Sequence, residues 1–153
     1  MSNQYPGYVL VIERTFDAPA EEVFEAWTSE EVLRRWFRGD PNWETPTAEV
    51  DLRVGGRLRV VMRDPKAGED HGAGGEYTVV DPPSRLAFTW KWDDQGSERQ
   101  LIELEFTERD GATTLRMTSH GIATEERVDS HREGWGVCFD SLDRALDLRG
   151  ERR

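Results

Sequence analysis

The sequence predicts an α+β fold, in which a curved antiparallel sheet of seven strands is covered by a long C-terminal helix, and two short helices follow the first strand. Three observations support this. Apolar residues recur at steps of three, four and seven between residues 125 and 149, which is typical of an amphipathic helix. Two shorter helical patterns precede residue 38. Much of the remaining chain alternates apolar and polar residues, as half-buried strands do.

The N-terminal part predicts one strand and two short helices. Residues 8–16 are rich in β-branched and aromatic side chains and predict the first strand. Pro19 ends this strand and suits the first turn of a helix, whose apolar stripe comprises Val23, Phe24 and Trp27. Residues 28–31 have the spacing of a capping box, and the helix after them has the apolar stripe Val32, Leu33, Trp36 and Phe37.

Residues 38–46 predict a loop, because they are rich in glycine, proline and asparagine, yet they include Trp43. Two interpretations of this tryptophan remain open. Its indole folds back onto the edge of the domain, or it forms a lid over a pocket.

The central part predicts six further strands. Residues 47–54 and 57–63 alternate with a period of two around Gly55-Gly56, which predicts a hairpin. Residues 64–75 are glycine-rich and charged and predict a flexible loop. The remaining strands are expected at 76–80, at 86–92, at 102–106 and around Leu115 and Met117, with turns or loops at 81–84, at 93–97 and at Asp110-Gly111.

The long C-terminal helix contains an unusual site, where Gly134 and Gly136 flank Trp135. Each glycine should cost about 1 kcal/mol relative to alanine inside a helix. One interpretation is a kink or close packing on a strand. The other is that the helix gives up packing volume around the indole because a cavity lies beneath it.

Composition limits the class of protein. The 153 residues suit one domain, 1–153, and 36% hydrophobic residues are too many for a disordered chain. Twenty basic and 31 acidic residues give a net charge of −11, which repels nucleic-acid backbones and anionic membrane surfaces. We therefore expect no nucleic-acid partner. The acidity suits solubility, and a basic protein partner is the alternative.

Cellular location is predicted from two absences in the sequence. Cys138 is the single cysteine, so there is no intrachain disulfide, which is consistent with a reducing compartment. The N-terminal segment has neither a basic region nor a long apolar run, and no window reaches about 18 apolar residues. We expect a soluble, cytoplasmic protein with no membrane insertion.

Four segments occur in an order that is typical of one superfamily: FDAPAEEVFEAWTSEEVLRRWF (16–37), DLRVGGRLRVVM (51–62), GGEYTVVDPPSRLAFTW (74–90) and Gly134-Trp135. With these segments the chain resembles the helix-grip or SRPBCC superfamily, which includes START lipid-transfer domains, birch-pollen-allergen-like proteins and polyketide cyclases. The most similar branch is named for the C-terminal domain of the activator of the heat-shock protein 90 ATPase. The resemblance covers residues 8–148 and implies a sheet wrapped around the long helix, with a hydrophobic cavity between them.

Two departures limit what the resemblance implies for function. The sequence Trp36-Phe37-Arg38-Gly39 stands where relatives often have Trp-Trp-Gly-Pro, so the rim of the cavity is expected to differ. We also expect no separate N-terminal domain, which weakens any direct transfer of the chaperone-activator role.

Large aromatic and methionine side chains on the concave face either fill a core or line a pocket for an apolar ligand. Both interpretations remain open for each residue. On the family geometry, the predicted ligand-binding residues are Trp36, Trp43, Met62, Tyr77, Trp90, Phe106, Met117, His120, Trp135 and Phe139.

Catalytic and metal sites have little support in the sequence. The histidines, His71, His120 and His131, lack the spacing of a metal site, and no nucleotide-binding loop occurs, so we expect no metal and no cofactor. His120, at a strand end, is the one candidate general base, but Ser119 should face the opposite side of its strand. Cys138 is predicted to be a small core residue.

The favoured function is non-catalytic binding of an apolar or amphipathic small molecule between the sheet and the C-terminal helix. A chaperone-related protein-interaction module, using the acidic surface, is the first alternative. An enzyme of the cyclase or hydrolase type, using Tyr77 or His120, is the second. The sequence does not predict the oligomeric state.

Overall fold

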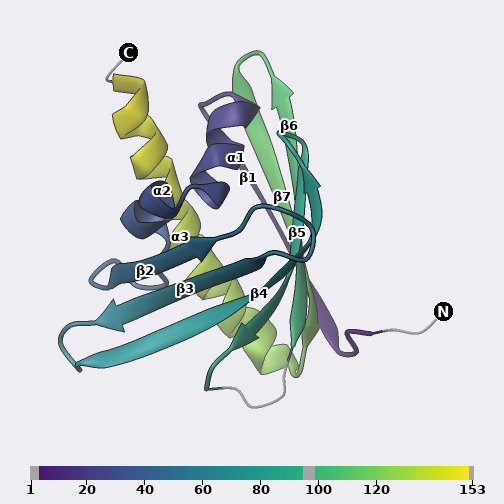
Figure 1. Cartoon of the computed structure of the whole chain (residues 1–153), viewed down its shortest axis with the longest axis vertical. Helices are drawn as coiled ribbons and strands as arrows, with labels where there is room; N and C mark the ends of the chain where they lie inside the picture. Colours follow the sequence, from purple (N-terminus) through teal and green to yellow (C-terminus); the bar gives the residue numbers. More distant parts are fainter. Residues whose placement is uncertain (1–3, 95–98, 152–153) are drawn as a thin grey trace.

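A computed structural model describes residues 4–94 and 99–151, so residues 95–97 of the predicted loop lie outside the described part (Figure 1). Within the described residues the fold has seven strands and three helices. In chain order these are β1 (Tyr8–Phe16), α1 (Ala20–Thr28), α2 (Glu30–Trp36), β2 (Glu44–Val50), β3 (Arg57–Asp64), β4 (Glu69–Asp81), β5 (Arg85–Trp92), β6 (Gln100–Arg109), β7 (Ala112–Ile122) and α3 (Glu125–Glu151).

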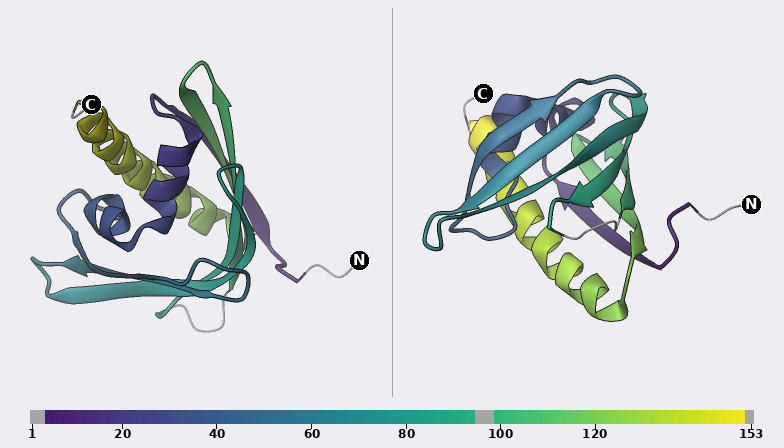
Figure 2. Two further views of the ribbon diagram at one scale, coloured as in Figure 1. Left: turned by 45° about the horizontal axis from the view of Figure 1, so that its top comes forward. Right: turned by 60° about the horizontal axis from the view of Figure 1, so that its bottom comes forward.

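The seven strands form one antiparallel sheet in the order β1-β7-β6-β5-β4-β3-β2. The sheet is a meander from β2 to β7, and β1 adds to the far side of β7 as an edge strand. Figure 2 shows that β2–β4 and β5–β7 form two halves that meet at a corner, with all three helices on the inner side. The predicted α+β class, the seven strands and the covering C-terminal helix are confirmed.

The helix α3 lies in the concave side because one of its faces is apolar. Its buried apolar residues recur at steps of one, three and four, as burial of a single helix face requires: Trp135, Cys138, Phe139, Leu142 and Leu146. On the β1 side, the Arg14 guanidinium lies 2.7 Å from the Asp140 carboxylate and 5.9 Å from the centre of the Phe139 ring. This pairing fixes the helix against the edge strand. No helix in the described part combines the length and hydropathy of a membrane span.

The short helices close one end of the concave side, and the predicted helix start between them needs a correction of one residue. The hydroxyl of Ser29, not that of Thr28, caps α2, because it accepts the Val32 N–H at 3.3 Å. The Thr28 hydroxyl instead donates to the Phe24 carbonyl within α1. Phe24 then packs edge-on against Phe106 of β6, with ring centres 5.4 Å apart, and thereby fixes α1 to the sheet.

The prediction of a flexible loop at 64–75 is wrong for most of its length, because β4 begins at Glu69. The glycines that predict a loop here instead allow close backbone packing inside a strand. A Cβ atom on Gly74 would lie 2.3 Å from the Leu58 carbonyl oxygen of β3, and one on Gly75 would lie 1.9 Å from the Thr89 carbonyl oxygen of β5. These contacts bring β3, β4 and β5 together where the two halves of the sheet meet.

The predicted strand at 47–54 is shifted relative to the observed one. The strand β2 starts within the predicted loop, at Glu44, and ends at Val50, after which the chain makes a hydrogen-bonded turn to β3. Leu52 and Val54 lie in this turn and are 39% and 64% exposed. The alternation of apolar and charged residues in the sequence therefore extends four residues beyond the end of β2.

The hairpin predicted at Asp110-Gly111 is confirmed. Both residues have positive φ angles, 54° and 80°, as a two-residue turn of type I′ requires. The turn sets the register of β6 against β7, with Arg109 opposite Ala112. The corresponding prediction of a turn at 81–84 is also confirmed.

Candidate ligand-binding pocket

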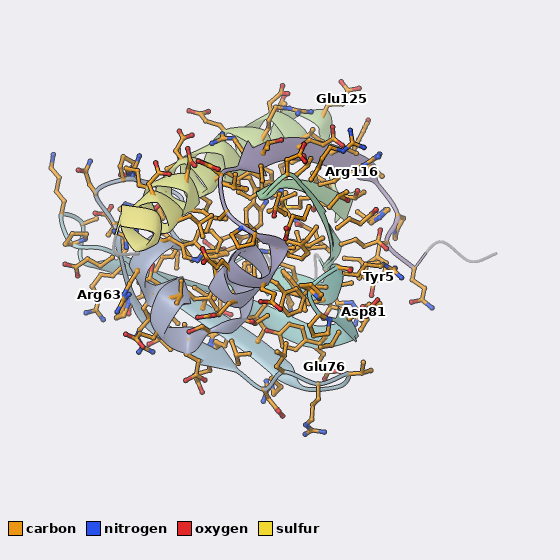
Figure 3. The ribbon with its side chains drawn as sticks, turned by 90° about the horizontal axis from the view of Figure 1, so that it is seen from above. Tyr5, Arg63, Glu76, Asp81, Arg116 and Glu125 are labelled. Atoms are coloured by element: carbon orange, nitrogen blue, oxygen red, sulfur yellow. The ribbon has the colours of Figure 1, made fainter. Side chains whose placement is uncertain are left out.

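An aromatic core fills most of the space between α3 and the sheet. Figure 3 shows the side chains packed between them, with labelled charged residues such as Arg116 and Glu125 at the periphery. Six of the ten predicted ligand-binding residues belong to this core, and each is at most 5% exposed: Trp36, Tyr77, Trp90, Phe106, Met117 and Phe139. The structure thus places these six in the packed interior.

Trp135 lies at the boundary between the packed core and open space. Its ring is 5.7 Å from that of Phe37, 6.3 Å from that of Trp90 and 6.2 Å from that of Phe139. These contacts hold the indole on one side. Trp135 also lines a pocket, at the end of the concave side near the first half of α3.

The pocket has a volume of about 270 Å³ and draws its walls from five parts of the chain. This volume lies just below the range of roughly 300–1,000 Å³ that is usual for small-molecule sites. Among the predicted residues, Trp43, Met62 and Trp135 line it. The full lining is Phe37, Gly39, Trp43, Met62, His71, Trp92, Asp94, Ser130, His131, Gly134, Trp135 and Cys138.

The two helix glycines face open space. A Cβ atom added to Gly134 or to Gly136 would meet no atom within 4 Å outside the helix's own backbone. The interpretation that they permit close packing on a strand is therefore wrong. Gly134 lines the pocket, so a missing side chain there leaves room for a ligand. Nothing in the structure explains Gly136.

Trp43 forms one wall of the pocket and is half-buried. Its indole stacks on the His71 imidazole of β4, with ring centres 4.8 Å apart and planes 10° apart. The Arg38 guanidinium donates to the backbone carbonyl of Trp43 at 3.2 Å. The indole is thus packed against β4 and borders the pocket at the same time.

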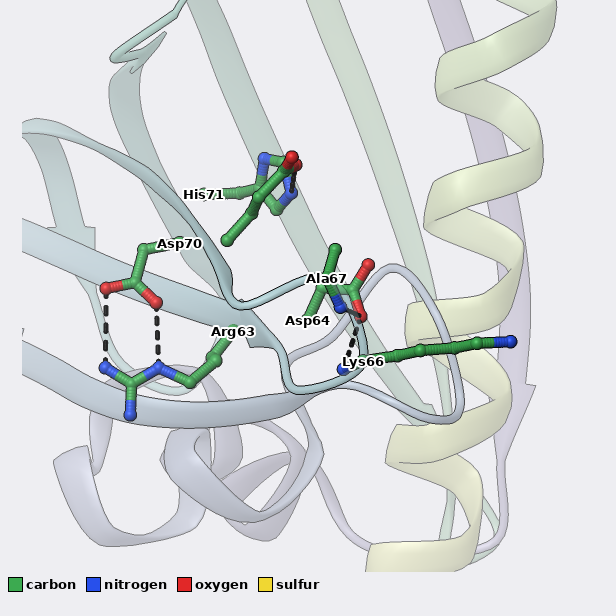
Figure 4. Close-up of polar contacts among 7 residues, drawn as sticks. Arg63, Asp64, Lys66, Ala67, Asp70 and His71 are labelled. Atoms are coloured by element: carbon green, nitrogen blue, oxygen red, sulfur yellow. Dashed lines mark hydrogen bonds and ion pairs between the residues drawn. The ribbon is translucent and has the colours of Figure 1, made fainter.

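The position of His71 depends on the β3–β4 hairpin. Arg63 and Asp70 join the two strands through two hydrogen bonds, of 2.8 and 3.4 Å, as Figure 4 shows. Asp64 closes the connecting turn by accepting the backbone N–H groups of Lys66 and Ala67, at 3.0 and 3.2 Å. These contacts hold His71 at the register position opposite Met62. An imidazole predicted to lie in a mobile loop therefore lies in an ordered pocket wall.

His120 and Ser119 face opposite sides of β7, as predicted. His120 lies on the outer face, where its Nε2 is 2.6 Å from the Glu103 carboxylate, and it does not line the pocket. Ser119 is buried on the inner face and donates to the Gln100 side chain at 3.3 Å. The structure therefore places His120 away from the position at the cavity mouth that a general base would need.

Tyr77, the other candidate for catalysis, is buried in the core. Burial raises the pKa of its hydroxyl above the ordinary value, so the phenol stays neutral. Among the described residues no group hydrogen-bonds to this hydroxyl. The same part of the chain holds no cluster of three or more His, Cys, Asp or Glu side chains that could bind a metal ion.

Cys138 borders the pocket and is buried, so the prediction that it is a small core residue is confirmed. The thiol donates to the Arg38 carbonyl oxygen at 3.0 Å. Burial raises the pKa of the Cys138 thiol to about 12, with the hydrogen bond to Arg38 acting in the opposite direction. The thiolate, the reactive form, is therefore scarce at neutral pH.

We expect Cys138 to react with a thiol reagent at least about 100-fold more slowly in the folded protein than in the unfolded chain, because both burial and the raised pKa suppress thiolate attack. Since the chain has one cysteine, the rate of reaction with dithionitrobenzoate at pH 8, with and without 8 M urea, measures this directly. Equal rates in a protein shown to be folded by circular dichroism would contradict the buried position.

Several pocket residues were outside the predicted set. Trp92 belongs to the predicted concave face of its strand, so its position follows the alternation of the sequence. His71 is not in the predicted set because its glycine-rich, charged segment predicts a loop, whereas it lies in β4. Asp94, Ser130 and His131 carry no pattern that separates them from surface residues, and the fold alone brings them to the pocket.

Comparison with known proteins identifies the relatives of the chain. Residues 17–147 match the family described as Activator of Hsp90 ATPase homolog 1-like protein. No curated protein matches the sequence.

Solved structures with the same architecture come from several bacteria. The AHSA1 protein of Silicibacter pomeroyi is 25% identical, with a TM-score of 0.82, and the match covers 93% of this chain and 99% of that one. An AHSA1-like protein of Aeromonas hydrophila is 26% identical, with a TM-score of 0.80, and 94% of each chain is covered. A Mycobacterium smegmatis protein is 25% identical, with a TM-score of 0.76, and 90% of each chain is covered.

Proposed function

Because the chain belongs to the family of Activator of Hsp90 ATPase homolog 1-like proteins, we propose that it uses the cavity of that fold to bind a small apolar or amphipathic molecule without catalysis. The single observation that carries the proposal is the open space beside Gly134. A glycine inside a helix costs about 1 kcal/mol, and no backbone contact requires it here. A cavity that must admit a ligand gives a reason for this cost.

The chemistry of the pocket supports the same function. Its inner wall is apolar and is formed by Phe37, Met62 and Trp135. Polar side chains of His71 and Ser130 are also part of the lining, and they can orient a polar group by hydrogen bonding. An apolar wall with a few polar groups is the usual composition of a small-molecule site. At about 270 Å³, the pocket suits a compact ligand, with one ring or a short chain.

The proposal is tested by filling the pocket from the helix. We expect Gly134→Leu to weaken ligand binding at least about tenfold, which is 1.4 kcal/mol, because the new side chain occupies the ligand's space. Leucine also has a higher helix propensity than glycine, so stability should not fall. Binding is measured by titrating compact amphiphiles, such as short alcohols and monocyclic aromatic compounds, while following fluorescence of the pocket tryptophans.

Gly136→Leu is the matched control. It makes the same substitution two residues further along α3, also in open space, at a residue that does not line the pocket. We expect it to leave binding unchanged. Equal affinities for Gly134→Leu and the original protein would contradict the proposal, as would the absence of binding by every compound tested.

A chaperone-related protein interaction is the second candidate, and it rests on the name of the family, which refers to an Hsp90 ATPase activator. The net charge of −11 would favour a basic partner surface. Salt-sensitive capture of a purified basic partner that is unaffected by Gly134→Leu would support this candidate. Capture that is lost in Gly134→Leu would instead tie the partner to the pocket.

A further inference from the structure

The described lining of the pocket is rich in aromatic rings and contains no lysine or arginine. Four aromatic side chains contribute, and they come from different parts of the chain: Phe37, Trp43, Trp92 and Trp135. Asp94 supplies the one carboxylate in this lining. We propose that the ligand carries a positive charge and is a compact organic ammonium ion. This inference rests on the proposed function and names the class of ligand for that pocket.

The aromatic rings supply negative electrostatic potential. The faces of indole and phenyl rings attract cations within about 6 Å of the ring centre, and indole does so most strongly. The rings that line the pocket are not parallel, since Trp135 is inclined by 88° to Phe37. Rings at different inclinations can border one small cation on several sides. An ammonium ion with methyl or alkyl substituents suits such a site, because its surface is apolar while its charge is spread over it.

Three arginines close to the pocket in the described structure have polar partners of their own. Arg59 is held by Asp93 through hydrogen bonds of 3.0 and 2.6 Å, and Arg63 is held by Asp70. Arg38, beside the pocket, donates to the backbone carbonyls of Trp43 and Arg35 at 3.2 and 2.6 Å. These neutral acceptors leave its positive charge in place, but its side chain is not part of the lining. An anionic head group would therefore meet no lysine or arginine in the lining, and it would face the Asp94 carboxylate.

The net charge of the protein also favours a cationic ligand. The net charge of −11 concentrates cations near the surface and repels anions, and this increases the rate at which a cationic ligand arrives. The volume of about 270 Å³ limits the ligand to a short-chain or single-ring ammonium ion. His71 and His131 also line the pocket, so all probes are compared at one pH, 8.

The experiment compares three probes of nearly equal shape by tryptophan fluorescence. They are benzyltrimethylammonium, its neutral carbon isostere neopentylbenzene, and the anion phenylmethanesulfonate. We expect the cation to bind about tenfold more tightly than the neutral isostere, and the anion to bind most weakly. Equal or tighter binding of the neutral isostere would overturn the charge inference and leave the proposed function standing. Absence of binding by all three probes would overturn both.

Two variants separate the local carboxylate from the overall charge. Asp94→Asn should weaken benzyltrimethylammonium binding about two- to fivefold, because an exposed charge pair contributes modestly, and should leave neopentylbenzene binding unchanged. Asp81→Asn removes the same charge from an exposed residue at the far end of β4 and should affect neither probe. Equal effects of the two substitutions on cation binding would overturn the role assigned to Asp94.

Discussion

Replacing Trp36 with alanine is expected to lower the free energy of unfolding by about 3–5 kcal/mol, which is the usual cost of removing a buried aromatic side chain. Trp36 is 0% exposed, and its ring packs edge-on against that of Trp27 with centres 4.9 Å apart. Its indole N–H donates to the Ala26 carbonyl at 2.8 Å. The substitution therefore leaves both a cavity and an unpaired buried carbonyl. Urea denaturation followed by circular dichroism measures the loss.

Trp43→Ala is the control for this effect. Trp43 is half-buried and stacks on His71 at the pocket, so its removal should cost less, about 1–2 kcal/mol. A loss for Trp36→Ala no larger than that for Trp43→Ala would show that the aromatic core is not packed as described.

Gly75→Ala should destabilise the protein by about 3 kcal/mol, although it adds a single methyl group. The new Cβ atom would lie 1.9 Å from the Thr89 carbonyl oxygen and 2.5 Å from the Thr89 hydroxyl. That hydroxyl accepts the Glu76 N–H at 2.9 Å, so the clash also disturbs the contact between β4 and β5. Since the opposing atom belongs to the backbone, relief requires movement of a strand. Thermal and urea unfolding both measure this effect.

Replacing Gly136 with alanine should raise the free energy of unfolding, whereas Gly75→Ala should lower it. An alanine there meets no atom within 4 Å and replaces glycine inside a helix, which should stabilise the protein by up to about 1 kcal/mol. Comparing the two variants separates a local clash from a general effect of alanine. A destabilised Gly136→Ala variant, or an unchanged Gly75→Ala variant, would contradict the backbone placement of that glycine.

The architecture was predictable because side-chain periodicity reports which face of an element is buried. The alternation around Leu115 and Met117 and the helical spacing of Trp135, Phe139 and Leu142 both correspond to inward-facing residues. The errors occurred where local composition and tertiary packing disagree. Gly74 and Gly75 belong to a glycine-rich segment, which predicts a loop. They lie inside β4 because the backbones of the neighbouring strands leave no space for a side chain there.

The pocket was less predictable than the fold. Periodicity separates inward from outward residues, but it does not distinguish an inward side chain that packs on others from one that borders a space. Trp90 and Trp92 follow the same alternation, and only Trp92 lines the pocket, because β5 ends there and leaves the second indole half-covered. Residues such as Asp94 and His131 are brought together by the ends of β5 and the first turns of α3. The spacing of these residues in the sequence does not predict that they lie close together in the fold.

The sheet order sets a delay during protein synthesis. Phe16 of β1 pairs with Thr113 of β7, which lies 97 positions later in the chain. At a translation rate of about 5–20 residues per second, the ribosome needs roughly 5–20 s to make this partner after β1 has been completed. Leu10 and Phe16, fully buried in the finished protein, have neither β7 nor α3 to cover them during that interval. The strand that is made first is thus among the last to be sheltered from water.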